Sequence, residues 1–167
     1  MYKRQDIYEK ERPVGIQIFG ANLDSMLRSV DIVEKTNPDI IDINFGCPVK
    51  KVVCKGAGAG ILKDIDKMEM LTREMAKRTK LPITVKTRLG WDEKTIKIVE
   101  VAERIQDAGA KAITIHGRTR AQMYKGNADW SLISEVKNNQ RMKIPVFGNG
   151  DVNSCLLYTS PSPRDEL

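Results

Sequence analysis

Short apolar runs alternate with longer amphipathic segments along most of this chain. Five runs are rich in β-branched residues and end at glycine, proline or a polar residue, which predicts β-strands; they are 15–20, 40–44, 82–88, 112–116 and 144–147. Four segments between them repeat apolar residues every three or four positions, which predicts helices; they are 23–36, 65–79, 95–108 and 130–139.

This alternation predicts how the elements assemble. No hairpin turn joins two of the strands, so strands linked by helices predict a parallel sheet. The strands are apolar almost throughout, which predicts that the sheet is covered on both faces. Polar residues follow the carboxyl ends of successive strands, and this favours a (β/α)8 TIM barrel, whose active site is assembled at those ends. A doubly wound sheet binds its ligand only at a switch point, so that fold does not call for polar residues at the ends of successive strands.

The segment 42–48 is the most informative single stretch. Its sequence is Asp-Ile-Asn-Phe-Gly-Cys-Pro, and Gly46 and Pro48 end the strand abruptly. Asn44 and Cys47 are therefore expected at the carboxyl end of a strand. Taken alone, the segment fits a buried structural cysteine beside a turn asparagine equally well. The loop 49–60 that follows is rich in lysine and then in glycine and alanine, but it lacks the pattern of a phosphate-binding loop.

Composition narrows the class of protein. The chain has 167 residues, of which 41% are hydrophobic, so one domain with a packed core is expected. Its 28 Lys and Arg against 22 Asp and Glu give a net charge of +6, which permits an anionic partner, although the charges are scattered as on an ordinary solvated surface. No run approaches a membrane span and no signal peptide is recognisable, so a cytoplasmic protein is predicted.

The cysteine pattern argues against two kinds of site. The three cysteines contain no Cys-x-x-Cys pair and are accompanied by a single histidine, so a zinc site or any other metal site is not expected. An odd cysteine count without a secretion signal also argues against a disulfide framework. Chemistry at Cys47 is therefore expected to use a reduced thiol.

Taken in order, the strand-end motifs resemble those of the tRNA-dihydrouridine synthases, most closely the bacterial type. The matching stretches are 17–20, 42–48, 50–51, 85–91, 114–120 and 148–151. The resemblance implies an FMN-binding TIM barrel followed by a small helical domain that holds tRNA. It also implies a reaction, the reduction of uridine to 5,6-dihydrouridine in tRNA, in which NADPH reduces FMN and the flavin passes hydride to C6 of the base.

Cys47 matches the general acid of that family, which protonates C5 of the uracil. A thiol with an ordinary pKa of about 8.5 is mostly protonated at neutral pH, so it can donate a proton. Asn44 and Arg88 match contacts to the uracil, which has to leave its stack to enter the pocket. Trp91, Met123 and Tyr124 are expected to be loop packing. The implied partner is tRNA, and the protein is expected to be a monomer without a membrane or metal partner.

The resemblance also assigns residues to the cofactor. Gln17 matches a residue that hydrogen-bonds the isoalloxazine ring, and His116 matches another flavin contact. Lys86 matches a cation at the N1–C2 edge, where it stabilises the negative charge of reduced FMN. The loop that helps hold the FMN phosphate is matched by Asn149, Gly150 and Asp151. Taken singly, His116 fits a satisfied strand-end histidine, Lys86 or Arg88 fits a surface ion pair, and Asn149 to Asp151 fit a plain turn.

The resemblance covers strands three to seven of the eight barrel strands. We therefore expect a partial FMN-binding barrel domain over residues 1–154 and a tail over 155–167 that resembles a translated sequencing adapter. Five strands cannot close a barrel, so this polypeptide alone is expected neither to fold well, nor to bind FMN, nor to be active. Two rival interpretations are another FMN barrel, such as a dihydroorotate dehydrogenase, and an inactive barrel fragment. Which tRNA uridine is modified does not follow from the sequence.

Overall fold

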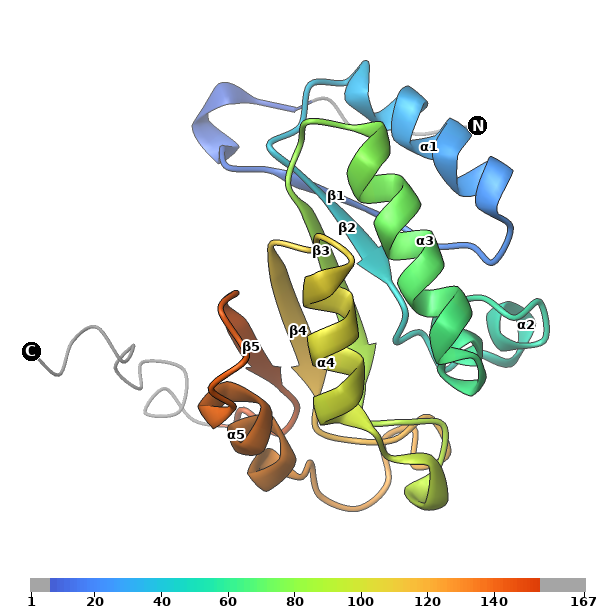
Figure 1. Cartoon of the computed structure of the whole chain (residues 1–167), viewed down its shortest axis with the longest axis vertical. Helices are drawn as coiled ribbons and strands as arrows, with labels where there is room; N and C mark the ends of the chain where they lie inside the picture. The colour runs from blue at the N-terminus through green and yellow to red at the C-terminus, as the bar shows by residue number, and fades with distance from the viewer. Residues whose placement is uncertain (1–6, 154–167) are drawn as a thin grey trace, which may run out of the picture.

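In a computed structural model of the chain, residues 7–153 are described, and they form a curved parallel sheet with helices packed on it (Figure 1). The five strands lie in sequential order. They are β1 (Gly15–Ile18), β2 (Ile40–Asn44), β3 (Ile83–Arg88), β4 (Ala112–His116) and β5 (Val146–Asn149). All four neighbouring pairs are parallel, so the predicted strands and their parallel pairing are confirmed.

Four helices connect these strands, and each matches a predicted helix. They are α1 (Leu23–Glu34), α3 (Ile65–Arg78), α4 (Ile98–Asp107) and α5 (Trp130–Asn138). Three begin at a polar side chain that accepts from a backbone N–H of the first turn, namely Asn22, Asp64 and Asp129. Helix α4 starts later than predicted because Asp92 and Thr95 cap each other around a separate 3-10 turn, η3 (Glu93–Thr95).

The predicted loop 49–60 contains regular structure. It holds the short helix α2 (Lys50–Val53) and the start of the 3-10 segment η2 (Gly58–Lys63). A further 3-10 turn, η1 (Glu9–Glu11), precedes β1. Strand β5 also differs from its prediction, since it begins after Pro145 and extends to Asn149. Asn149 therefore belongs to the strand rather than to the turn that follows it.

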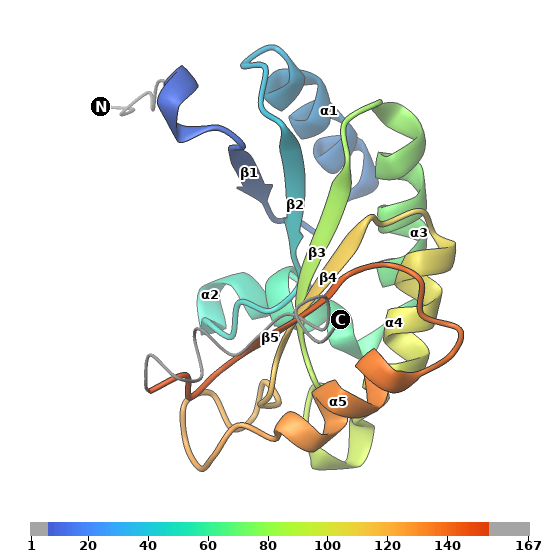
Figure 2. The same ribbon diagram turned by 90° about the vertical axis from the view of Figure 1, so that its left-hand side faces the viewer.

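The sheet has one face toward the helices and one face that they leave uncovered. Figure 2 shows α1, α3, α4 and α5 on the same side of the sheet. Along β2, Ile41 and Ile43 are fully buried toward the helices, whereas Asp42 and Asn44 alternate with them and are partly exposed. The prediction that both faces are covered is therefore wrong. Right-handed crossovers between strands laid down in sequential order bring every helix to the same face, as in a barrel.

The hydrophobic core fills the space between the sheet and these helices. Its fully buried members include Val30 of α1, Met75 of α3 and Val85 of β3. Burying a side chain of this size contributes about 1.5–3 kcal/mol, so the core supports the helix-facing side of the sheet. The opposite face carries polar side chains near the carboxyl ends of the strands.

Two absences apply to residues 7–153. In that range no helix is both long and apolar enough to cross a membrane, and no three His, Cys, Asp or Glu side chains gather as a metal site would require. The predicted domain boundary at 154 and the predicted tail 155–167 lie outside the described residues, and both stay predictions.

Candidate active site

Cys47 lies in a tight turn directly after β2. The side-chain oxygen of Asn44 accepts hydrogen bonds from the backbone N–H groups of Gly46 and Cys47, each at 2.9 Å. The carbonyl of Cys47 accepts from the N–H of Ala59, also at 2.9 Å. These bonds engage the backbone of Cys47 and leave its half-buried thiol free of them. The turn therefore presents a fixed thiol at the carboxyl end of the sheet, as the sequence predicts.

A row of side-chain hydrogen bonds connects β1, β2 and β3 below this turn. The carboxylate of Asp42 accepts from Gln17 Nε2 and from Thr84 Oγ1, each at 2.6 Å. Gln17 Oε1 in turn accepts from Asn44 Nδ2 at 2.7 Å. Gln17, Asp42 and Thr84 are direct neighbours in the strand register. The structure thus brings the predicted residues Gln17 and Asn44 into direct contact, while Asp42 binds the other end of the Gln17 amide.

Asp42 and Thr84 are site residues that the sequence analysis does not predict. The available signal was a carboxylate within the apolar run Ile40–Asn44. A charged residue inside an otherwise apolar strand needs partners, because an unpaired charge is costly to bury. The sequence does not identify those partners, since they lie on other strands.

Lys86 and Asn149 meet between β3 and β5. Lys86 Nζ donates to Asn149 Oδ1 at 3.1 Å, which joins strand ends that are separated by β4. Burial lowers the pKa of Lys86, the nearby Arg88 lowers it further, and Asp42 acts in the opposite direction. Two predicted cofactor residues therefore lie within hydrogen-bonding distance of each other on the uncovered face of the sheet.

His116 is half-buried at the end of β4, among cations. Burial first, and then the charges of Arg88, Lys86 and Arg118, together lower its pKa to about 4, against the opposite effect of Asp151. Its Nδ1 atom is buried and has no hydrogen-bond partner among the described residues. Gly150, with a φ of +112°, lies so close that a Cβ there would be 2.9 Å from Nδ1. The site thus holds a neutral imidazole with an unpaired polar atom.

We expect the Cε1 proton resonance of His116 to titrate with a pKa of about 4. The absence of this signal from the spectrum of the full-length His116→Gln variant assigns it. Between pH 6.5 and pH 4 the unfolded state binds more protons at this residue than the folded state, so stability falls as the pH falls through that window. The His116→Gln variant should lose this part of the pH dependence in urea denaturation. A titration midpoint near 6.5 would contradict the buried, cation-flanked environment.

Arg88 is buried beneath the turn that carries Cys47, with 3% of its surface exposed. Its Nε donates to the carbonyl of Gly46 at 2.9 Å, and its Nη1 donates to the carbonyls of Thr119 and Met123 at 3.1 and 2.8 Å. The guanidinium therefore ties the Cys47 turn to the loop after β4. Its predicted contact with uracil stays a prediction.

Three loop residues that are expected to pack behave differently from one another. Trp91 is partly buried against the core, as predicted. Met123 and Tyr124 are 41% and 73% exposed, so the packing prediction is wrong for them. Arg88 holds the backbone of Met123, and its guanidinium carbon lies 5.8 Å from the centre of the Tyr124 ring. Arg88 thus holds the loop that carries both exposed side chains close to the candidate site.

Asp151 forms an ion pair with Arg118 at the end of β5. Arg118 Nη2 lies 2.7 and 2.8 Å from the two carboxylate oxygens, and the N–H of Ala128 donates to the same carboxylate at 2.6 Å. The Ala128 N–H first, and then Arg118, hold the pKa of Asp151 below its usual value. A carboxylate accepts hydrogen bonds and donates none. If this turn contacts a phosphate, as the sequence predicts, its backbone N–H groups rather than the Asp151 carboxylate would donate the hydrogen bonds.

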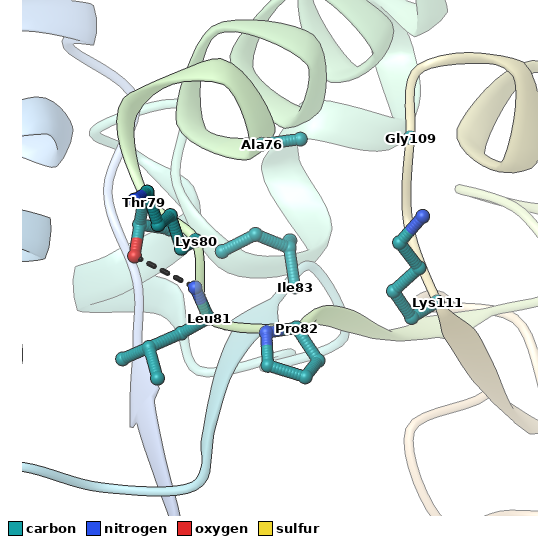
Figure 3. Close-up of a pocket in the computed structure, with 8 residues that line it drawn as sticks. All are labelled: Ala76, Thr79, Lys80, Leu81, Pro82, Ile83, Gly109 and Lys111. Carbon is teal, nitrogen blue, oxygen red and sulfur yellow. Dashed lines mark hydrogen bonds between the residues drawn. The ribbon is translucent and has the colours of Figure 1, made fainter.

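A separate pocket lies at the amino end of β3, beside Pro82 (Figure 3). Its volume is about 320 Å³, and Thr79, Leu81, Gly109 and Lys111 are among its lining residues. The Thr79 hydroxyl in this pocket accepts from the N–H of Leu81 at 3.0 Å. Active sites of (β/α) barrels lie at the carboxyl ends of the strands. This pocket is at the opposite end from Cys47, so we exclude it from the candidate active site.

Comparison with known proteins identifies the family. Residues 1–157 match the family described as dihydrouridine synthase (Dus). The chain belongs to the dihydrouridine synthase family. This match confirms the resemblance seen in the sequence motifs. It also favours a dihydrouridine synthase over the rival interpretation of another FMN barrel.

Curated dihydrouridine synthases align with most of the chain. The probable tRNA-dihydrouridine synthase 1 of Synechocystis sp. is 44% identical over 149 residues, which are 89% of this chain and 41% of that protein. The tRNA-dihydrouridine synthase B of Vibrio vulnificus is 38% identical over 153 residues, 91% of this chain and 47% of that protein. The chain thus spans less than half the length of these relatives.

The fold is shared with a solved structure of another family. The crystal structure of YagE, a prophage protein of the dihydrodipicolinic acid synthase family from E. coli K12, superposes with a TM-score of 0.52. The sequences are 15% identical, and the match covers 76% of this chain and 38% of YagE. That identity supports the fold alone. The sheet of this member of the dihydrouridine synthase family is part of a TIM barrel, which confirms the predicted fold class.

Proposed function

We propose that the protein to which this chain belongs reduces uridine in tRNA to 5,6-dihydrouridine. The observation that carries the proposal is the gathering of Cys47, Asn44, Lys86 and His116 at the carboxyl end of one sheet in a member of the dihydrouridine synthase family. The names of the curated relatives support tRNA as the substrate. The net charge of +6 is compatible with a polyanionic partner.

The residues at this end of the sheet suit FMN as the cofactor. The buried Nδ1 of His116 lacks a partner among the described residues, and Gly150 brings backbone against it where a side chain would clash. Gln17, Lys86 and His116 would hold the ring, while Asn149, Gly150 and Asp151 would form the turn at the phosphate. Bound FMN, reduced by NADPH, would supply the hydride that adds to C6 of the uracil.

The chain's own residues would supply the proton and orient the base. Cys47 Sγ–H would protonate C5, so the C5=C6 double bond becomes a single bond and the thiolate recovers its proton from solvent. Asn44 uses its oxygen for the turn and one N–H for Gln17, which leaves its second N–H for a uracil carbonyl. Arg88 Nη2 forms no hydrogen bond to the described residues and is a second donor.

The test is a tRNA assay with the full-length protein. An unmodified tRNA transcript is incubated with protein, FMN and NADPH, and its nucleosides are separated and weighed by mass spectrometry. We expect one uridine to gain two hydrogen atoms only when protein and NADPH are both present. Unchanged uridine with saturating FMN and several different tRNA transcripts would contradict the proposed function.

A further inference from the structure

The hydrogen bonds that join Asp42 to the Cys47 turn have a fixed direction. The Asp42 carboxylate can only accept, so Gln17 has to present its NH2 group, at 2.6 Å. The oxygen of Gln17 then faces Asn44 and accepts from Nδ2 at 2.7 Å. With its NH2 group used in that way, Asn44 presents its oxygen to the backbone N–H groups of Gly46 and Cys47. Each orientation supports the next.

We propose that Asp42 is a positioning residue, whose carboxylate fixes the amide orientation of Gln17 and thereby supports Asn44 and the turn of Cys47. The inference rests on the proposed function in so far as Cys47 acts as the proton donor. Asp42 itself is separated from Cys47 by two side chains and acts only through them. We call Asp42, Gln17 and Asn44, with the two N–H groups of the turn, the Asp42 relay.

The charge at position 42 is the physical basis of this role. The amide groups of Gln17 and Asn44 could each be turned end for end without a change of shape, so shape alone does not select one orientation. The backbone N–H groups of the turn can only donate, so they fix Asn44 from one end, and the Asp42 carboxylate can only accept, so it fixes Gln17 from the other. Hydrogen bonds to an ionised group are roughly twice as strong as neutral ones. Thr84 Oγ1 donates to the other carboxylate oxygen at 2.6 Å and holds Asp42 in place. The strand register supports this arrangement, since Asp42 is the direct neighbour of both Gln17 and Thr84.

The Asp42→Asn variant tests this proposal with little change in size. An amide at position 42 can offer either its oxygen or its nitrogen to Gln17, because the Thr84 hydroxyl can donate or accept. The relay then loses its charged acceptor, and only the two N–H groups of the turn still set its direction. We expect hydrogen–deuterium exchange at the amides of Gly46 and Cys47 to rise on the order of fivefold, the scale of one hydrogen bond. Iodoacetamide should also label Cys47 faster relative to the exposed Cys54.

A second substitution should restore the relay. In Asp42→Asn with Gln17→Glu the carboxylate moves to the neighbouring strand, where it can accept from Asn44 and from the amide introduced at position 42. The oxygen of that introduced amide then accepts from Thr84. The Asn44 oxygen again faces the turn, so exchange at Gly46 and Cys47 should return to within about twofold of the original rate, well inside the scale of one hydrogen bond.

Two single substitutions complete the set. Gln17→Glu alone places two carboxylates side by side on neighbouring strands, so it should impair the turn. Thr84→Val removes one donor to Asp42 but leaves every member of the Asp42 relay in place, so it should have the smallest effect.

These measurements are made on the full-length protein by mass spectrometry that resolves single amides, without tRNA or NADPH. Amides of the core, such as those of Ile105 and Ile113, should keep their exchange rates in every variant. Unchanged exchange at Gly46 and Cys47 in Asp42→Asn would overturn the proposal. A uniform rise in amide exchange across the chain would also overturn it. So would exchange at Gly46 and Cys47 in the double variant that is as fast as in the single variants. If the original protein makes no dihydrouridine, the proposed function fails, while the exchange data still test the relay.

Discussion

Replacing Cys47 with alanine is expected to stop dihydrouridine formation while leaving FMN bound. Loss of a general acid typically costs about 10²–10⁴ in rate. The hydrogen bonds that hold the turn use the backbone N–H and carbonyl of Cys47, not its side chain, so the variant should keep the turn. The measurement is the single-turnover yield of dihydrouridine by nucleoside mass spectrometry, with the flavin absorbance recorded on the same sample.

The chain offers a matched control for this variant. Cys54 lies at the end of α2, seven residues after Cys47, but it is exposed, so Cys54→Ala should keep the original rate. Cys47→Ser keeps the size of the side chain but supplies a much weaker acid, and it should resemble the alanine variant. Full dihydrouridine yield from Cys47→Ala would remove the thiol from the mechanism.

Replacing Gly58 with alanine is expected to damage both stability and activity. Gly58 has a φ of +54°, and a Cβ there would lie 2.8 Å from the carbonyl oxygen of Cys47 and 2.9 Å from Val52 Cγ1. Left-handed backbone costs a non-glycine residue roughly 1–2 kcal/mol, and overpacking costs about 1–3 kcal/mol more. A displacement of about 1 Å at a reacting group can cost on the order of 100-fold in rate. Urea denaturation and the tRNA assay measure the two losses.

Gly56→Ala is the control for the backbone strain. Gly56 also has a left-handed backbone, with a φ of +71°, but the nearest atom to a Cβ there is Ala21 Cβ at 3.7 Å. This variant should lose roughly 1–2 kcal/mol from strain and keep most of its activity. Equal activity losses in the Gly56 and Gly58 variants would show that contact with Cys47 is not the cause.

The positions of many site residues could be predicted from the sequence, but the hydrogen-bond partners of their side chains could not. Asn44 and Cys47 lie at the end of β2 as expected, because glycine and proline end a strand locally. Asp151 is predicted at a phosphate, yet its carboxylate pairs with Arg118, which comes from the loop after β4. Arg88 likewise donates three hydrogen bonds to backbone carbonyls of segments that are far from it in the sequence. Such partners depend on how loops meet, and local sequence carries little information on that.

Local sequence is enough to predict the alternation of strands and helices, the parallel sheet and the place of Cys47, because periodicity and turn residues act over a few neighbouring positions. Three-dimensional packing was needed to show that one face of the sheet stays free of helices and that Asp42 lies beside Gln17 and Thr84. Those residues are 25 and 42 positions from Asp42 in the chain. Their contact depends on strand register, which is set by packing of the whole sheet against its helices.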